Sequence, residues 1–336
     1  MTKQPLVSIL VPFKNTAEYV TECLDSVLAQ TYAHWEVIAV NDGSTDQSRS
    51  LVSKYAQKDG RIALLDNQGK GIIPALRAAF AQSGGDLITR MDSDDIMQPN
   101  KLEVMVRALQ AHGPKHLAIG QVRYFSHRGI SNGYARYEAW LNGLTATGSN
   151  YSEIYKECVV PSPCWMVHRE DLLQVRAFEP NRYPEDYDLT FRFYEAQLAC
   201  IPCDQVLHLW RDYDTRTSRT SEHYAQNYFL DIKLHYFLML DRDPSVPLVV
   251  WGAGNKGKTI AKALVHKGVD FHWICDNPNK IGKTIYGKLM RSVAALNQLD
   301  RAQSIVTVAN EDAQADIRAY FHAREPKPMQ DHFFFC

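Results

Sequence analysis

Residues 87–96 read Leu-Ile-Thr-Arg-Met-Asp-Ser-Asp-Asp-Ile, an apolar run followed by three carboxylates within four positions, Asp92, Asp94 and Asp95. The apolar run has the pattern of a buried strand, and Gln98-Pro99-Asn100 has the pattern of the turn after it. Carboxylates this close repel one another unless a positive charge lies among them. Mg2+ or Mn2+ holding a phosphate would supply that charge, since such ions take one or two carboxylates plus substrate oxygens. Taken alone, the stretch also fits a solvated acidic turn.

The segments before this stretch alternate between buried strands and amphipathic helices. Strand patterns cover 6–12, 35–40 and 61–65, and helix patterns cover 17–28, 47–57 and 72–82. This alternation predicts an α/β doubly wound sheet, in which ligands bind beyond the carboxyl ends of the strands. Three polar clusters follow such ends and are expected to meet at one edge: Pro12-Phe13-Lys14, Asn41-Asp42-Gly43-Ser44 and Asp92 to Asp95. The first half has no GxxxxGK[ST] loop, so a bound diphosphate would depend on metal rather than on backbone amides.

Three stretches in this order resemble the family 2 glycosyltransferases. They are VSILVPFKN (7–15), YVTECLDSVLAQTYAHWEVIAVNDGSTDQS (19–48) and GIIPALRAAFAQSGGDLITRMDSDDIMQPNKL (71–102). The resemblance implies a GT-A fold with a mixed sheet, a nucleotide-sugar donor, a divalent cation and inversion at the anomeric carbon. Family donors are most often UDP-linked.

The resemblance also assigns candidate residues for donor and metal binding. It implies that Pro12, Phe13 and Asp42 hold the nucleoside. It implies that Asp92-Ser93-Asp94 is the DxD motif, with Asp94 on the metal and Asp92 near ribose, phosphate and metal. Arg77 stands where the family often has Asn, and there it either adds a diphosphate contact or solvates its helix.

A second acidic pair, Glu185-Asp186, resembles the family's ED motif at a helix start. Inverting transfer needs a base to take the proton of the acceptor hydroxyl, and we assign Asp186 to this role with Glu185 as the alternative. The alternative is that neither residue is catalytic and that both are carboxylates stabilised by the helix macrodipole. Ser162 stands where the family often has His.

Further on, Trp210-Arg211 fits the family's loop over the diphosphate, and Tyr213 stands near the expected His. Arg211 is therefore a candidate donor contact. Arg216 and Arg219 either clamp phosphate or belong to a solvated basic loop.

Residues 244–336 are expected to form a second, small Rossmann-like α/β domain after a domain spanning 1–243. A strand pattern at 246–251 leads into Gly252-Ala253-Gly254-Asn255-Lys256-Gly257, then a helix, then a strand that ends in Asp276. This is the GxGxxG order of a dinucleotide site, with Gly252, Gly254, Gly257 and Asp276 as its candidate residues. Less than a full dinucleotide fold follows, so we favour a docking or regulatory module over bound NAD.

Bulk composition narrows the remaining classes. A net charge of -1 over 336 residues argues against nucleic acid as the main partner. Seven scattered cysteines, an odd number, favour reduced thiols in the cytoplasm over a disulfide framework. The apolar helix at 228–240 either lies on the inner face of the membrane or packs against the second domain. We favour packing against the second domain. The final Phe333–Cys336 either fills a groove or forms a contact in a homo-oligomer.

Together with these patterns, the resemblance implies a metal-dependent, hexosyltransferase-type enzyme of polysaccharide biosynthesis. It would move a sugar from a nucleotide diphosphate to a hydroxyl of a polysaccharide, lipid-linked or other glycan acceptor. Two alternatives stay open. One is a nucleotidyltransferase, although the glycine-rich loop expected after its first strand is missing. The other is a non-catalytic nucleotide sensor that uses the GxGxxG domain.

Overall fold

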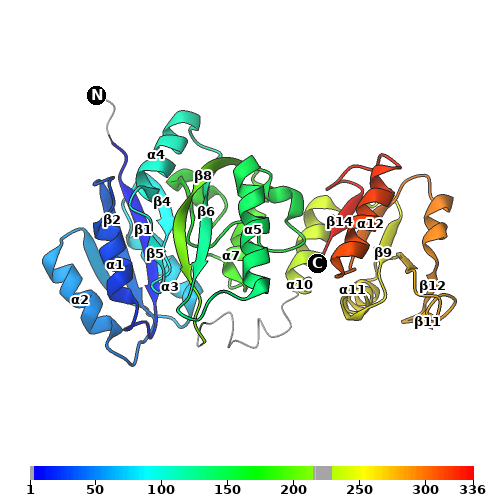
Figure 1. The fold of residues 1–336 in the computed structure, drawn as a ribbon, viewed down its shortest axis with the longest axis horizontal. Helices are drawn as coiled ribbons and strands as arrows, with labels where there is room; N and C mark the ends of the chain where they lie inside the picture. The colour runs from blue at the N-terminus through cyan, green and yellow to red at the C-terminus, as the bar shows by residue number, and fades with distance from the viewer. Residues whose placement is uncertain (1–3, 215, 217–228) are drawn as a thin grey trace. The chain divides into compact units, whose positions relative to one another are not determined.

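The computed structural model describes residues 4–214, 216 and 229–336, which divide into two compact units (Figure 1). The first unit consists of 4–151 with 159–214 and 216. The second consists of Ser152–Cys158 with 229–336. The boundary expected between 243 and 244 stays a prediction.

The first unit is built on a mixed sheet of eight strands in the order β3-β2-β1-β4-β7-β6-β8-β5. The strands are β1 (Val7–Phe13), β2 (Trp35–Asn41), β3 (Ile62–Asp66), β4 (Leu87–Arg90), β5 (Ile96–Met97), β6 (His116–Phe125), β7 (Trp165–His168) and β8 (Ala199–Arg211). Strands β3, β2, β1 and β4 are parallel, β7 is antiparallel to β4 and β6, and β5 is antiparallel to β8. The α/β class and the mixed sheet of the prediction are confirmed.

Helices cover both faces of this sheet, because its central strands are apolar on both sides. Every residue of β1 is buried. Side chains alternate across a strand, so Ile9 packs in one cluster with Leu24 of α1, whereas Leu10 packs in the other with Leu76 of α3. The helices of this unit are α1 (Val20–Leu28), α2 (Ser48–Lys58), α3 (Ile72–Gln82), α4 (Lys101–His112), α5 (Asn132–Thr147), α6 (Arg169–Gln174) and α7 (Glu185–Glu195). The short 3-10 turn η1 (Asn150–Glu153) begins in this unit and ends in the second.

The strand register brings the polar strand ends together. Phe13 at the end of β1 pairs with Asn41 of β2, and Asn41 pairs with Asp66 of β3. Arg90 at the end of β4 pairs with Leu10 of β1. The loops after β1, β2 and β4 therefore leave the sheet at the same edge, which is the edge where the candidate residues were expected.

The second unit carries a six-stranded sheet in the order β11-β12-β10-β9-β13-β14. Its strands are β9 (Leu248–Trp251), β10 (His272–Ile274), β11 (Thr284–Ile285), β12 (Lys288–Arg291), β13 (Gln303–Val306) and β14 (His332–Phe334). Its helices are α10 (Leu230–Tyr236), the π-helix η2 (Phe237–Asp241), α11 (Asn255–His266), the 3-10 helix η3 (Val293–Gln298) and α12 (Glu311–His322). All pairs are parallel except β11 with β12. The expected second α/β fold is thus present.

Residues 152–158 are part of the second unit, although the residues before and after them in the sequence belong to the first. The ring of Tyr155 stacks on Phe335 with centroids 5.3 Å apart and lies edge-on to Phe237 and Phe333. Its hydroxyl donates to Asp241 Oδ2 at 2.5 Å. The Phe333–Cys336 segment, expected in a groove or an oligomer contact, is thus packed inside the second unit at Phe333 to Phe335.

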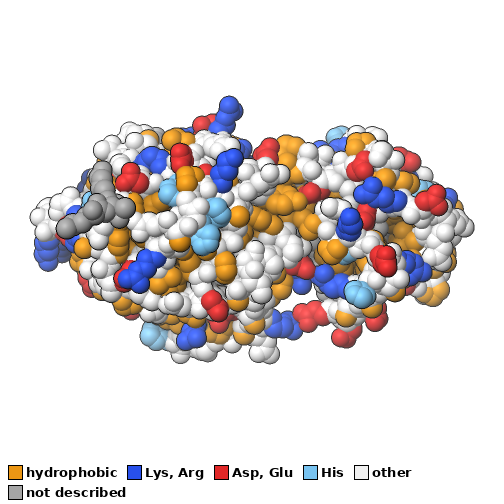
Figure 2. All heavy atoms as spheres, turned by 90° about the horizontal axis from the view of Figure 1, so that it is seen from above, with side chains coloured by type: hydrophobic (Ala, Val, Ile, Leu, Met, Phe, Trp, Pro, Cys, Tyr) orange, Lys and Arg blue, Asp and Glu red, His pale blue; other side chains and the backbone are white. Residues whose placement is uncertain are grey.

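Two surface features bear on the expected partners. Among the described residues, no helix is long and apolar enough to cross a membrane. In the helix expected at 228–240, Leu230, Ile232 and Leu234 are buried, whereas Met239 is half exposed. Figure 2 shows acidic and basic side chains interspersed over the visible face, in keeping with a net charge near zero.

Candidate functional site

Asp42 lies at the end of β2, next to the end of β1. Its backbone N–H donates to Phe13 O at 2.9 Å, so two of the predicted nucleoside contacts are neighbours. Oδ1 of Asp42 accepts from Asn67 Nδ2 at 2.7 Å and from the Gly71 N–H at 2.9 Å, and Oδ2 lies 3.4 Å from Lys14 Nζ. The carboxylate is therefore fixed by the loop after β3, with Oδ2 on its more open side. Pro12 and Phe13, the last two residues of β1, are both buried.

Asp95, the last carboxylate of the acidic loop, points into the protein. It is fully buried, and it accepts from the Arg211 N–H at 2.8 Å and from His208 Nε2 at 2.9 Å. Burial raises the pKa of Asp95 to about 7. Both of its oxygens are occupied by protein donors, so Asp95 anchors the loop and leaves ligand binding to its neighbours.

Asp92 and Asp94 retain partial exposure. Asp94 Oδ2 accepts from Tyr213 Oη at 2.8 Å, and burial together with the charge of Asp95 raises the pKa of Asp94 to about 7. A cation beside Asp94 would favour its ionised form, so this environment suits a metal. Among the described residues, no three His, Cys, Asp or Glu side chains are grouped to hold a metal. A Mg2+ or Mn2+ ion that takes its other ligands from a diphosphate and water needs only one or two carboxylates, so Asp94 and Asp92 fit such an ion.

Arg90 connects the acidic loop to the second acidic pair. Its guanidinium is buried, and it donates to Asp92 Oδ1 at 2.8 Å and to Glu185 Oε1 at 2.9 Å. Burial raises the pKa of Glu185 to about 7, against the opposing charge of Arg90. Arg90, to which the sequence analysis gave no role, thus links the DxD and ED motifs. It also holds Glu185 in an ion pair.

Asp186 is the more open member of the ED pair. It lies in the first turn of α7, where Oδ1 accepts from the Tyr187 N–H at 2.8 Å. Ser162 Oγ donates to Oδ2. The residue that replaces the family's His therefore contacts the carboxylate proposed as the base, and it orients that carboxylate without adding a charge.

Two predicted donor-binding arginines hold protein loops in this structure. Arg77 donates through Nε to Phe178 O at 3.0 Å and through Nη2 to Glu179 O at 2.8 Å, which braces the loop that leads to α7. Arg211 donates through Nε to Asp94 O at 2.7 Å and pairs with Glu22. Their predicted contacts with the diphosphate stay predictions. Arg219 lies outside the described residues, and Arg216 lies over the ring of Trp210 at 5.2 Å.

The sequence reading missed Lys101 and His208, which are both fully buried behind the acidic loop. Burial and the charge of Lys101 lower the pKa of His208 well below its usual value. The available signal was the position of His208, a polar residue between Leu207 and Leu209 in an apolar strand.

The glycine turn of the second unit has close strand–helix packing. A Cβ on Gly257 would lie 2.2 Å from Gly252 O, and one on Gly252 would lie 2.5 Å from Thr307 Oγ1. A Cβ on Gly254 would meet nothing within 4 Å, and Lys280 Nζ donates to the neighbouring Ala253 O at 2.7 Å. Gly252 and Gly257 thus serve packing, whereas Gly254 leaves space above the turn. Asp276 is exposed after β10, and a nucleotide site here stays a prediction.

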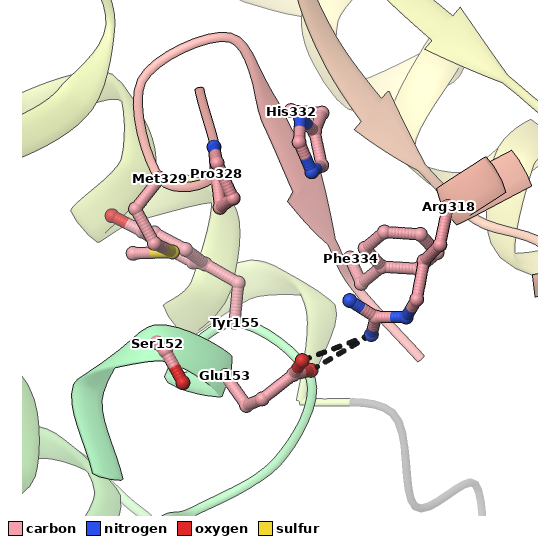
Figure 3. A pocket seen from close by; sticks show the side chains of 8 residues that line it. All are labelled: Ser152, Glu153, Tyr155, Arg318, Pro328, Met329, His332 and Phe334. Atoms are coloured by element: carbon pink, nitrogen blue, oxygen red, sulfur yellow. Dashed lines mark hydrogen bonds and ion pairs between the residues drawn. The ribbon is translucent and has the colours of Figure 1, made fainter. Parts of the chain in front are cut away.

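A separate small cavity lies in the second unit (Figure 3). Glu153 and Arg318 form an ion pair at 2.9 Å on one side of it, and His332 lies on another. Its volume of about 10 Å³ is close to what one water needs, so a nucleotide does not fit there.

Comparison with known proteins identifies the family. The profile of glycosyl transferase family 2 matches residues 8–176, just over half of the chain. An uncharacterized glycosyltransferase of Haemophilus influenzae is 36% identical over 234 residues, which cover 66% of this chain and 70% of that protein. Glycosyltransferase GlyG of Streptococcus pneumoniae is 37% identical over 106 residues, or 31% of this chain and 35% of GlyG. The chain spans about a third or less of the length of GlyG and several other curated relatives.

A solved structure shows the fold. The crystal structure of S. aureus TarS 1–349 in complex with UDP-GlcNAc matches with a TM-score of 0.54 at 19% identity, covering 77% of this chain and 71% of that chain. The GT-A fold expected from the sequence is thereby confirmed. The chain belongs to glycosyl transferase family 2.

Proposed function

We propose that this protein is a metal-dependent inverting glycosyltransferase of the hexosyltransferase type. It moves a sugar from a UDP-linked donor to a hydroxyl of a polysaccharide, lipid-linked or other glycan acceptor. The observation that carries the proposal is the buried Arg90 bridge, which joins Asp92 of the acidic loop to Glu185, the residue beside Asp186. Family membership supports transfer from a nucleotide sugar, and the UDP-GlcNAc bound by TarS supports a UDP-linked donor.

In this proposal the end of β1 and the start of the β2 loop hold the nucleoside. Asp42 is oriented by Asn67 and the Gly71 N–H, and Phe13 lies beside it. A fixed carboxylate at this position suits the hydrogen-bond donors of a base edge or a ribose. Pro12 completes the apolar floor under the nucleoside.

Asp94, with Asp92, would hold Mg2+ or Mn2+ against the donor diphosphate. The resemblance to the family implies a divalent cation here. The bound ion would neutralise the charge that develops on the leaving diphosphate. Arg90 keeps Asp92 in place and offsets its charge, and Tyr213 orients Asp94 through its hydroxyl.

Asp186 takes the proton of the acceptor hydroxyl as that oxygen attacks the anomeric carbon. The new glycosidic bond forms as the bond between the anomeric carbon and the phosphate oxygen breaks, and the nucleoside diphosphate leaves. Ser162 and the Tyr187 N–H fix the carboxylate of Asp186 for this transfer. Glu185 is the weaker candidate because Arg90 pairs with it.

The second unit is proposed as a docking or regulatory module, with a nucleotide at its glycine turn as the alternative. Calorimetry with NAD(H) and, separately, with UDP-sugars distinguishes the two. The proposal also covers the other partners of the protein, which are the glycan acceptor, the inner face of the membrane and a second copy of the chain.

The test is sugar transfer by purified protein with Mn2+, after a thermal-shift panel of nucleotide sugars has selected the donor. Asp186→Asn is expected to lower kcat by about 10²–10⁴-fold and to leave UDP binding intact. Asp188→Asn is the matched control, because Asp188 lies in the same helix turn but pairs with Arg192 and Arg182. An Asp186→Asn enzyme with full activity would overturn the assignment, and equal losses in both variants would favour the macrodipole reading.

A further inference from the structure

A row of buried polar side chains connects the acidic loop to the loop that contacts Asp186. Asp95 Oδ2 lies 2.9 Å from His208 Nε2, and His208 Nδ1 lies 3.4 Å from Lys101 Nζ. Lys101 Nζ also donates to Pro163 O. Asp95, His208 and Lys101 are all fully buried. The row therefore starts next to Asp94 and ends next to Ser162.

The hydrogen-bond geometry assigns the protons along this row. With Lys101 as an ammonium, which has only donors, His208 Nδ1 accepts from it. The single N–H of a neutral imidazole is then on Nε2, where it donates to Asp95. The result is a continuous hydrogen-bonded row in which the neutral ring of His208 accepts from Lys101 and donates to Asp95. Each member has a partner on both sides, which is what burial of charged groups requires.

Both ends of the row support residues that the proposed function uses. At one end, Asp95 Oδ1 accepts from the Arg211 N–H while Arg211 Nε donates to Asp94 O, so the loop that carries Asp94 is fixed from behind. At the other end, Pro163 follows Ser162, whose hydroxyl donates to Asp186.

We propose that Lys101, His208 and Asp95 are positioning residues that hold the metal loop and the base loop in register during sugar transfer. This inference rests on the proposed function. All three side chains are fully buried, so they act through the placement of Asp94 and Asp186. A displacement of about 1 Å at such groups can cost about 100-fold in rate. Replacing a buried polar cluster by apolar side chains of similar volume is often neutral or stabilising, so stability alone does not explain this row.

The test separates kcat from donor affinity. Lys101→Met removes the ammonium and keeps the length of the side chain. It is expected to lower kcat by about 10- to 100-fold and to change the Kd for UDP with Mn2+ by less than about 3-fold. His208→Phe is expected to behave in the same way, and the double variant to lose no more than the worse single one. His208→Gln can still accept from Lys101 and donate to Asp95, so it is expected to recover most of the activity.

Two measurements guard against a trivial loss of folding. Lys233→Met is the matched control, because Lys233 of the second unit is another fully buried lysine that donates to backbone carbonyls. It is expected to lower the unfolding temperature and to keep kcat. In the wild-type protein, 15N NMR of labelled histidine is expected to show His208 as the neutral tautomer with its proton on Nε2.

The outcomes are distinct. A folded Lys101→Met enzyme with wild-type kcat, additive losses in the double variant, or a His208 proton on Nδ1 would overturn the positioning role while the proposed function stands. Wild-type protein that neither binds UDP nor transfers sugar would overturn the proposed function and this inference together.

Discussion

Replacing Arg90 by Met would break the bridge between the acidic loop and α7 at its centre. The Arg90 side chain is 7% exposed, and its partners Glu185 and Asp92 are 8% and 18% exposed. Removing the guanidinium leaves two poorly hydrated carboxylates without their counter-charge. Breaking a buried pair in this way costs about 3–5 kcal/mol. For a unit of this size, such a loss lowers the unfolding temperature by about 6–20 °C.

The assay is thermal and urea unfolding of the full chain, with the transitions of the two units fitted separately. Arg49→Met is the matched control, since Arg49 also pairs with a carboxylate through two hydrogen bonds, of 2.9 and 2.7 Å to Asp66, but at the surface. Exposed pairs of this kind contribute little, so Arg49→Met should leave the transition nearly unchanged. Adding Glu185→Gln to Arg90→Met should restore part of the lost stability. If Arg90→Met and Arg49→Met destabilise equally, the bridge has no structural role and the reasoning fails.

Three further predictions concern the second unit. Tyr155→Ala should destabilise it by about 3–5 kcal/mol, because a fully buried ring packed among three aromatic rings is lost. A smaller loss of unfolding free energy in urea than an exposed tyrosine gives on substitution by Ala would contradict the packing. Burial and the charge of Arg318 lower the pKa of His332 to about 4, so the unfolded state binds more protons between about pH 4 and 6.5 and stability should fall as pH drops through that window. His332→Phe should flatten the dependence of the unfolding free energy on pH, measured by unfolding at several pH values. An unchanged dependence would mean that another group causes it. Gly257→Ala should cost at least about 1–3 kcal/mol by thermal unfolding because its Cβ would strike backbone, whereas Gly254→Ala should be tolerated, and the reverse order would refute the packing.

The strand ends and the acidic loop were predictable because each is encoded in a short local pattern. The apolar run before Asp92 defines a buried strand, and parallel strands place their carboxyl ends at one edge whatever the details of the sheet. The pattern was therefore enough to expect Asp42, Asp92 and Asp94 at one edge of the sheet, whereas the role of Asp186 came from the resemblance to the family.

The partners of the arginines were not predictable in the same way. Arg90 meets Glu185, which is 95 positions away, and Arg77 meets the carbonyls of the loop at 178–181. A guanidinium suits carboxylate, carbonyl and phosphate alike, so residue type alone cannot say which acceptor it will find. The register of β5 on β8, where Met97 pairs with His208, decides which residues stand behind the acidic loop.

The placement of residues 152–158 was hidden for a related reason. The sequence around this segment is rich in tyrosine, including Tyr151 and Tyr155, and residue type alone does not distinguish an acceptor-binding surface from packed loop residues. Tyr155 is packed, through contacts with Phe335, which lies 180 positions away and outside the part of the chain that resembles the family. Only the three-dimensional structure joins these two pieces.

The central claim is that Asp94 holds a metal against the diphosphate of the donor. Isothermal titration of UDP into the wild-type protein, with Mn2+ and then with EDTA, tests it directly, and Asp94→Asn is the paired variant. We expect UDP to bind at least about 10-fold more tightly with Mn2+ in the wild type, and we expect no metal-dependent gain in Asp94→Asn. Equal UDP affinity with and without Mn2+ in the wild type, or a full metal-dependent gain in Asp94→Asn, would contradict it.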